Sequence, residues 1–235
     1  MKKKVLSIAL VVALIAIMVS GTLAYFTAED EVTNTFTVGS VKIEIYENGN
    51  ATTEDVRELG VLTPVVNMDN PSADDSYLEK VVKVRNTGLN NAYVRTHIAI
   101  PTALVNYLDM DLDTTGWTVR TASTATVDGV AYTVYTFDYN NAITSGEYTS
   151  ELLKGVFLNS NVDLEEASNG DLYFVLRENG KITDQSGVLV HEKNDDGTYT
   201  SHKVCVLVAS QAIQADGFAN AASALDAGFT TNPWA

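Results

Sequence analysis

Three histidines, His97, His191 and His202, are the first candidates for metal or proton-transfer chemistry in this chain. A helical zinc peptidase site uses two histidines four positions apart, with a glutamate as base. No pair here has that spacing. His191 precedes Glu192, and a hairpin turn at Asp196-Gly197 would bring His202 opposite His191. Two interpretations stay open: a pair of imidazoles beside Glu192, or two exposed histidines on a hairpin.

Serines and aspartates supply the other candidates. Ser160, Ser186 and Ser201 lie in turn-like surroundings, without the strand–turn–helix elbow of a serine nucleophile. The alternating carboxylates of Asp109–Asp113 suit calcium, but the glycine and final glutamate of a calcium loop are missing, and a solvated acidic turn is the alternative. We therefore predict no catalytic residue, no metal ligand and no cofactor, and a protein that is not an enzyme.

Cys205 is the only cysteine, so no disulfide can form within the chain. It lies in the apolar run Lys203–Val208, where a small buried side chain is expected. An exposed sulfur would instead allow a disulfide between two molecules. Stability must then come mainly from a hydrophobic core.

The first 24 residues have the three parts of a secretory signal peptide in order. Lys2, Lys3 and Lys4 are followed by the apolar stretch Val5–Val19 and then by the small residues of Ser20–Ala24. We predict cleavage between Ala24 and Tyr25. The alternative is a permanent anchor over Val5–Phe26, which is just long enough to span a bilayer.

The chain after this leader is strongly acidic. Without the three leader lysines it has 12 basic and 30 acidic residues, a net charge near −18. Nucleic acid and anionic lipid both attract lysine- and arginine-rich surfaces, so this charge argues against either as a partner. We expect contact with a membrane only through the leader, before cleavage.

Most of the remaining chain is patterned as β-strands, with apolar residues at alternate positions between turn residues. The predicted strands are Tyr77–Asn86, Ala92–Ile100, Trp117–Ala122, Val130–Tyr139, Tyr148–Leu158, Leu172–Glu178, Gly187–Glu192 and Tyr199–Ala209. The turn residues of Thr87–Asn91 predict that the first two form an antiparallel pair.

Hairpin turns are predicted at Asp128-Gly129 and Asp196-Gly197, since this dipeptide tolerates the positive φ of a tight turn. Short helices are predicted over Thr102–Leu108, Asn161–Ala167 and Phe218–Phe229. Many short strands and few helices predict an all-β fold, a jelly-roll-like antiparallel β-sandwich with a few short helices. We expect this domain to extend over residues 39–235.

Residues 25–38 form a separate, strand-patterned segment at the start of the processed chain. Its apolar residues of one parity are Phe26, Val32, Phe36 and Val38. The alternation changes phase at Gly39, which predicts a hinge or bulge there. The segment is either an ordinary edge strand of its own sheet or a donor strand that pairs with the next molecule.

Several stretches resemble the TasA/camelysin family of exported Gram-positive proteins. The most specific are Gly21–Thr27 and Asn34–Gly39, and weaker ones are Asn86-Thr87-Gly88, Ala92–Arg95 and Ala212–Phe218. The middle of the chain matches only in general style. The resemblance implies a jelly-roll domain and processing by a dedicated, SipW-type signal peptidase.

For its best-known members, the family further implies assembly into fibres of the extracellular biofilm matrix, with the N-terminal segment as donor strand. We therefore expect a secreted structural protein of a Gram-positive cell surface or matrix that self-associates into oligomers or fibres. Camelysin-like members are often described as metallopeptidases, which is the weakest alternative because the paired histidines are missing. A monomeric secreted binding module, for carbohydrate or a host protein, is the other alternative.

Overall fold

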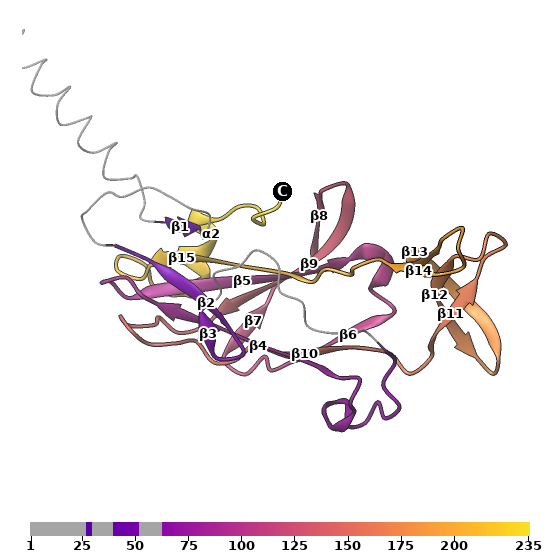
Figure 1. Ribbon diagram of the computed structural model, residues 1–235. Coiled ribbons are helices and arrows are strands. Elements are labelled where there is room, and N and C mark those ends of the chain that lie inside the picture. Colours follow the sequence, from indigo (N-terminus) through magenta and orange to yellow (C-terminus); the bar gives the residue numbers. More distant parts are fainter. Residues whose placement is uncertain (1–26, 30–39, 52–62) are drawn as a thin grey trace, which may run out of the picture.

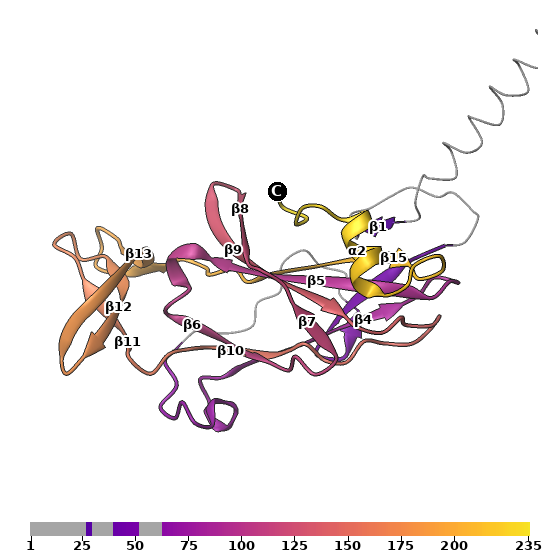
Figure 2. The same cartoon turned by 180° about the vertical axis from the view of Figure 1, so that it is seen from behind.

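The computed structural model describes residues 27–29, 40–51 and 63–235. Antiparallel sheets dominate this part of the chain, and helical segments in it are few and short. The prediction of an all-β antiparallel sandwich with a few short helices is confirmed. Two sheets lie face to face, and a third sheet extends from one end of the sandwich (Figures 1 and 2).

Six of the described strands form sheet I. Their order is β1 (Thr27–Glu29), β15 (Leu207–Gln214), β5 (Ala92–Pro101), β9 (Val130–Tyr139) and β7 (Trp117–Val119), with β8 (Ser123–Val127) also paired to β9. The β8–β9 hairpin turns at Asp128-Gly129, where both residues have positive φ, as predicted.

Sheet II faces sheet I and is formed by five of the described strands. Their order is β3 (Asn50–Ala51), β2 (Ile43–Glu47), β4 (Leu78–Asn86), β10 (Leu153–Leu158) and β6 (Leu108–Leu112). Sheet III, at the end of the molecule far from β1, has the order β11 (Val162–Glu166), β12 (Leu172–Glu178), β13 (Lys181–Lys193) and β14 (Tyr199–Ser201) (Figure 1).

In the described part of the chain, the helical segments are two short 3₁₀ turns and one α-helix. They are η1 (Pro71–Ala73), η2 (Thr102–Leu104) and α2 (Ala221–Gly228). Asn220 caps α2, because its side chain accepts a hydrogen bond from the Ser223 backbone N–H and the Ser223 side chain accepts one from the Asn220 backbone N–H. No helix among the described residues is long and apolar enough to cross a bilayer.

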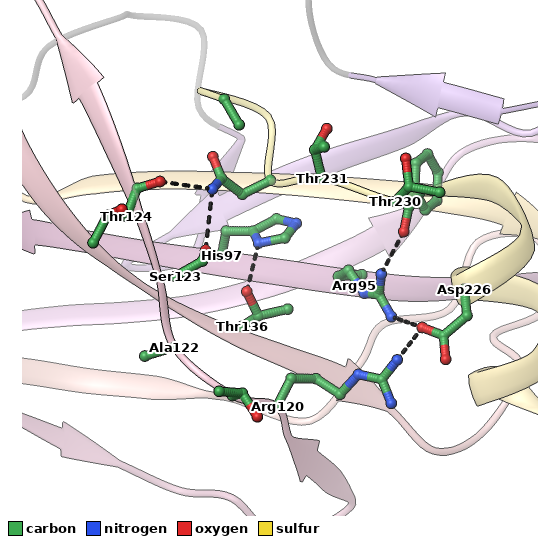
Figure 3. Close-up of a pocket in the computed structure, with 14 residues that line it drawn as sticks. Arg95, His97, Arg120, Ala122, Ser123, Thr124, Thr136, Asp226, Thr230 and Thr231 are labelled. Carbon is green, nitrogen blue, oxygen red and sulfur yellow. Dashed lines mark hydrogen bonds and ion pairs between the residues drawn. The ribbon is translucent and has the colours of Figure 1, made fainter.

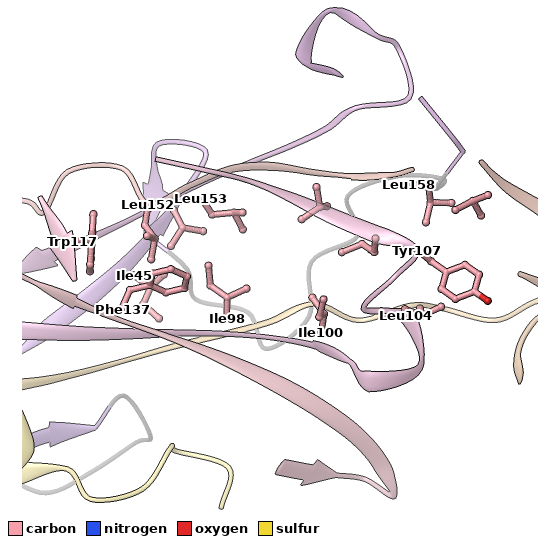
Figure 4. Packing of buried hydrophobic residues seen from close by; sticks show 14 of the residues in the cluster. Ile45, Ile98, Ile100, Leu104, Tyr107, Trp117, Phe137, Leu152, Leu153 and Leu158 are labelled. Atoms are coloured by element: carbon pink, nitrogen blue, oxygen red, sulfur yellow. The ribbon is translucent and has the colours of Figure 1, made fainter. Parts of the chain in front are cut away.

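The main hydrophobic core lies between sheets I and II. Ile98 and Phe137 of sheet I pack in one cluster with Val82 and Leu153 of sheet II (Figure 4). The same cluster continues to Phe174, on β12. This continuity of buried apolar side chains makes the sandwich and sheet III one folded unit.

The predicted antiparallel pairing of Tyr77–Asn86 with Ala92–Ile100 is wrong. Strand β4 pairs with β2 and β10 in sheet II, whereas β5 pairs with β15 and β9 in sheet I. The five residues Thr87–Asn91 therefore cross from one sheet to the other and do not form a hairpin. Turn residues indicate a change of direction, but they carry no information about which sheet the next strand joins.

Three further predictions are corrected. Asn161–Ala167 is not a helix: β11 pairs antiparallel with β12 over this stretch. The alternation of Val162 and Leu164 with Asp163 and Glu165 has the two-residue period of a strand. The predicted strand Tyr199–Ala209 is split, because β14 ends at Ser201 and β15 begins at Leu207. A helix was predicted over Thr102–Leu108, but only its first turn forms, as η2.

Asn86 holds the crossing between the sheets in place. Its side chain is fully buried and donates hydrogen bonds to the backbone carbonyls of Asn90, at 2.7 Å, and Ile143, at 2.9 Å. Its side-chain oxygen accepts from the Gly88 backbone N–H at 2.9 Å. One side chain thus satisfies three backbone groups at the point where the chain leaves sheet II.

We expect Asn86→Ala to lower the free energy of unfolding by about 2–4 kcal/mol, because it removes three hydrogen bonds made by a fully buried side chain. Asn140→Ala is the matched control, since Asn140 is exposed and accepts one hydrogen bond from Thr118. Urea unfolding of both variants measures the difference. Equal effects of the two substitutions would contradict this role for Asn86.

Candidate functional site

Strand β5 is buried on both of its faces, which is the starting point of the site. Val94, Thr96 and Ile98 face sheet II, while Arg95 and His97 point to the outer side of sheet I. There the helix α2 and the C-terminal residues lie over the sheet (Figure 3). A guanidinium and an imidazole are therefore enclosed beneath these segments.

Four charged side chains form a network on this outer face. Arg95 lies opposite Asp138 in the β5–β9 ladder and makes two hydrogen bonds with it, at 2.6 and 3.0 Å. A third goes to Asp226 of α2 at 2.7 Å, and a fourth to the Phe229 carbonyl at 3.0 Å. Arg120 pairs with both aspartates, lying 3.3 Å from Asp138 and also contacting Asp226.

The network joins α2 to sheet I and shifts the pKa values of Arg95 and Asp226. Burial alone would lower the pKa of Arg95, but its hydrogen bonds to Asp138 and Asp226 outweigh burial and raise it. Hydrogen bonds from Arg120 and then Arg95 lower the pKa of Asp226. The formal charges of the two arginines and the two aspartates sum to zero.

His97 lies beside this network and is almost fully buried. Its ring nitrogens contact Thr136 Oγ1 at 2.9 Å and Gln211 Oε1 at 3.0 Å. The Trp234 ring meets the imidazole edge-to-face. Burial lowers the pKa of His97 to about 4, so the imidazole is neutral at physiological pH.

An open cleft of about 810 Å³ lies above Arg95 and His97. One wall is the segment from Arg120 to Thr124 that leads into β8, and the other is the C-terminal segment from Phe229 to Asn232 (Figure 3). The Asn232 amide ties the two walls together by donating to Ser123 Oγ at 3.1 Å. Many of the lining side chains carry hydroxyl groups, so the cleft can make hydrogen bonds to a polar ligand.

His191 and His202, at the β13–β14 hairpin, each have a different partner. His191 lies opposite Ser201 in the β13–β14 ladder and contacts its hydroxyl at 2.9 Å. His202 lies 3.5 Å from Glu192, and its side chain is exposed. Among the described residues, no group of three or more His, Cys, Asp or Glu side chains is placed to hold a metal ion.

The three aspartates of Asp109–Asp113 also have separate partners. Asp111 accepts a hydrogen bond from the Tyr77 hydroxyl at 2.9 Å, and Asp113 pairs with Lys154 at 3.0 Å. Burial raises the pKa of Asp109, while hydrogen bonds from Thr115 and Lys154 lower the pKa of Asp113 to about 2. These carboxylates are therefore engaged individually, on β6 and just beyond it.

Of the remaining predicted residues, the structure describes Cys205 but not those of the N-terminal segment. Cys205 is half-buried, which is less than the complete burial expected of it. The cleavage site Ala24–Tyr25, the donor-strand residues Phe26, Val32, Phe36 and Val38, and the hinge Gly39 lie outside the described residues. Within the same N-terminal segment, β1 pairs with the chain's own β15 through Thr27↔Ile213, Ala28↔Ala212 and Glu29↔Gln211.

Comparisons with protein-family models, with curated proteins and with solved structures give no match. Within the described part of the chain, buried charges and polar side chains converge at the cleft, which makes it the candidate functional site.

Sequence reasoning missed Arg95, Asp138, Arg120 and Asp226 as a group. A signal was present in the strand Ala92–Ile100, where Arg95 and His97 occupy the parity opposite the apolar one. That pattern is also typical of a strand with one solvated face. Only the cover provided by α2 and the C-terminal segment distinguishes a buried network from a surface one.

The low pKa of His97 makes stability depend on pH. In the unfolded chain a histidine binds a proton below about pH 6.5, whereas folded His97 does so only near pH 4. Lowering the pH from 7 to 5 should therefore reduce the free energy of unfolding by about 2 kcal/mol through this residue. His97→Gln should remove that part of the pH dependence, measured by urea unfolding at both pH values.

His202→Gln is the matched control for this measurement, because its exposed side chain should leave the pH dependence as it is in the parent. A His97→Gln variant that keeps the parent's full pH dependence would show that His97 is not held neutral.

The two aspartates that pair with Arg95 should differ in their contribution to stability. Asp138 is 2% exposed and Asp226 is 52% exposed. We expect Asp138→Asn to cost about 3 kcal/mol, because it removes the buried counter-charge of Arg95. Asp226→Asn should cost less than about 1 kcal/mol, because its side chain is half in water. Thermal unfolding of the two isosteric variants tests this, and a larger loss for Asp226→Asn would contradict it.

Proposed function

We propose that this protein is a secreted structural component of a cell surface or extracellular matrix and that it associates with copies of itself. Three features support the proposal. The leader has the signal-peptide pattern described above, the processed chain is strongly acidic, and its first segment contains a strand at the open edge of sheet I. The proposal includes cleavage by a SipW-type peptidase and assigns the chain no catalytic activity.

The proposal of self-association rests on the outer edge of β15, of which β1 covers only a part. On its inner side β15 pairs with β5 over all eight of its residues, from Leu207 to Gln214. On its outer side β1 covers only the three residues Gln211–Ile213. Among the described strands, none pairs with the outer side of Leu207–Ser210. An open strand edge is a template for a strand from another chain.

Apolar side chains beside this edge suit such a strand. Val204, Val206 and Val208 pack against the main core, yet each remains only partly buried. A strand placed along the edge would cover them and add backbone hydrogen bonds. Because β1 already makes this kind of pairing within one molecule, the same segment can make it with a neighbour, as in domain swapping.

A monomeric secreted binding module is the second candidate. The polar cleft between β8 and the C-terminal segment favours it, because a structural subunit has no need of such a site. The two candidates predict different oligomeric states for the processed chain, and they are compatible if the cleft is presented on an assembled matrix.

Deletion of residues 25–38 should abolish assembly and leave the sandwich folded, because the main core does not include this segment among the described residues. Light scattering of the processed chain measures assembly, and circular dichroism with thermal unfolding measures the fold. Assembly that survives the deletion would contradict the donor-strand mechanism. A stable monomer before any deletion would favour the binding module.

A point substitution provides a finer version of the same test. Ala28→Pro removes the backbone N–H of the central β1 residue and should weaken assembly, whereas Ala28→Val keeps the strand and should not. Equal assembly of the two variants would count against pairing through β1.

A further inference from the structure

The walls of the cleft carry hydrogen-bonding groups that the fold leaves available. Thr124 of β8 is exposed, and so are Thr230 and Thr231 on the opposite wall. Arg120 is 31% exposed, and Asp226 is 52% exposed. The cleft therefore presents donors, acceptors and hydroxyls, which serve as both, within one opening (Figure 3).

The floor of the cleft is held in place by buried side chains that hydrogen-bond to one another. The side chain of Arg95 is 7% exposed and that of Asp138 is 2% exposed, and each is held by several charge-assisted hydrogen bonds. The Asn232 side chain fixes the opposite wall to β8. Such fixed surroundings lower the entropy lost when a ligand binds.

The charge balance of the cleft selects the class of ligand. Arg95 and Arg120 are matched by Asp138 and Asp226, so the site has no net charge to attract an anion. The large excess of acidic residues in the chain repels anions further. Phe229 is the only large apolar side chain among the lining residues, which disfavours a hydrocarbon ligand.

We infer that this cleft binds a neutral carbohydrate, a short stretch of a glycan whose hydroxyl groups both donate and accept hydrogen bonds. Sugar hydroxyls match the mixture of carboxylate, guanidinium and hydroxyl groups on the walls. The volume of about 810 Å³ lies within the range of roughly 300–1,000 Å³ found for ligand pockets. The inference does not depend on self-association, since none of the residues that line the cleft belongs to β1 or β15.

The first experiment asks whether the cleft binds sugars and of which charge. The processed full-length chain is labelled for NMR and titrated with neutral oligosaccharides of glucose, galactose and N-acetylglucosamine, and separately with oligogalacturonate. We expect saturable shifts of the Thr121–Thr124 and Thr230–Asn232 amides with at least one neutral probe and weaker effects with oligogalacturonate. No saturable shifts at these amides with any neutral probe, or tighter binding of oligogalacturonate, would overturn the inference.

The second experiment uses isosteric variants on one strand. Thr124→Val removes a hydroxyl from the cleft wall, and Thr126→Val makes the same change two residues along β8, outside the cleft. Loss of one hydrogen bond should raise the dissociation constant of the best neutral probe by about five-fold for Thr124→Val only. Equal affinities of the two variants would contradict binding in this cleft.

The third experiment tests the charge argument itself. Asp226→Asn keeps the shape of the side chain but gives the four-residue network a net positive charge. The variant should bind oligogalacturonate at least about five-fold more tightly than the parent does, and neutral probes less tightly. An unchanged preference for neutral over anionic sugar would show that the network does not set the ligand class. Thermal unfolding of the variant confirms that its fold is intact.

Discussion

The burial of β5 on both faces is the constraint on which the rest of the molecule depends. One face contributes Ile98 to the core between the two sheets. The other carries Arg95, a charge that cannot be enclosed without a partner. Asp138 meets it directly across the ladder, and Asp226 meets it from α2. The cover over sheet I is therefore attached through an ion network and not through apolar packing alone.

This arrangement makes the site and the fold interdependent. The C-terminal segment and α2 hide one side of sheet I, but with Arg120–Thr124 they leave a polar cleft above the network. Among the described strands, β1 alone pairs with the outer side of β15, over the three residues Gln211–Ile213. The proposed ligand site and the proposed assembly site would thus use different parts of sheet I, the first its outer face and the second its edge.

The local patterns of the sequence predicted many elements well. Alternation located β9 and β12 at their observed bounds, and the Asp-Gly dipeptide located the β8–β9 hairpin. Two of the incorrect predictions concern the type of one short element and the sheet that one strand joins. The stretch Asn161–Ala167 is short, so its polar residues suit a capped helix as well as the polar face of a strand. Its tertiary pairing with β12 decides in favour of the strand. The β4–β5 error arose because sheet membership depends on distant partners.

The crossing after Asn86 shows the limit of what local sequence patterns predict. The turn residues after Asn86 showed that the chain changes direction there, but not that the change crosses between sheets.

By itself, the sequence determined the all-β class, most strand positions and the excess of negative charge, because alternation and composition are local properties of the chain. It also defined the segment 25–38, whose donor role remains a proposal. Only the tertiary structure decided which strands share a sheet and which polar residues meet. Arg95, Arg120, Asp138 and Asp226 are separated by up to 131 positions, and long-range packing alone brings them together.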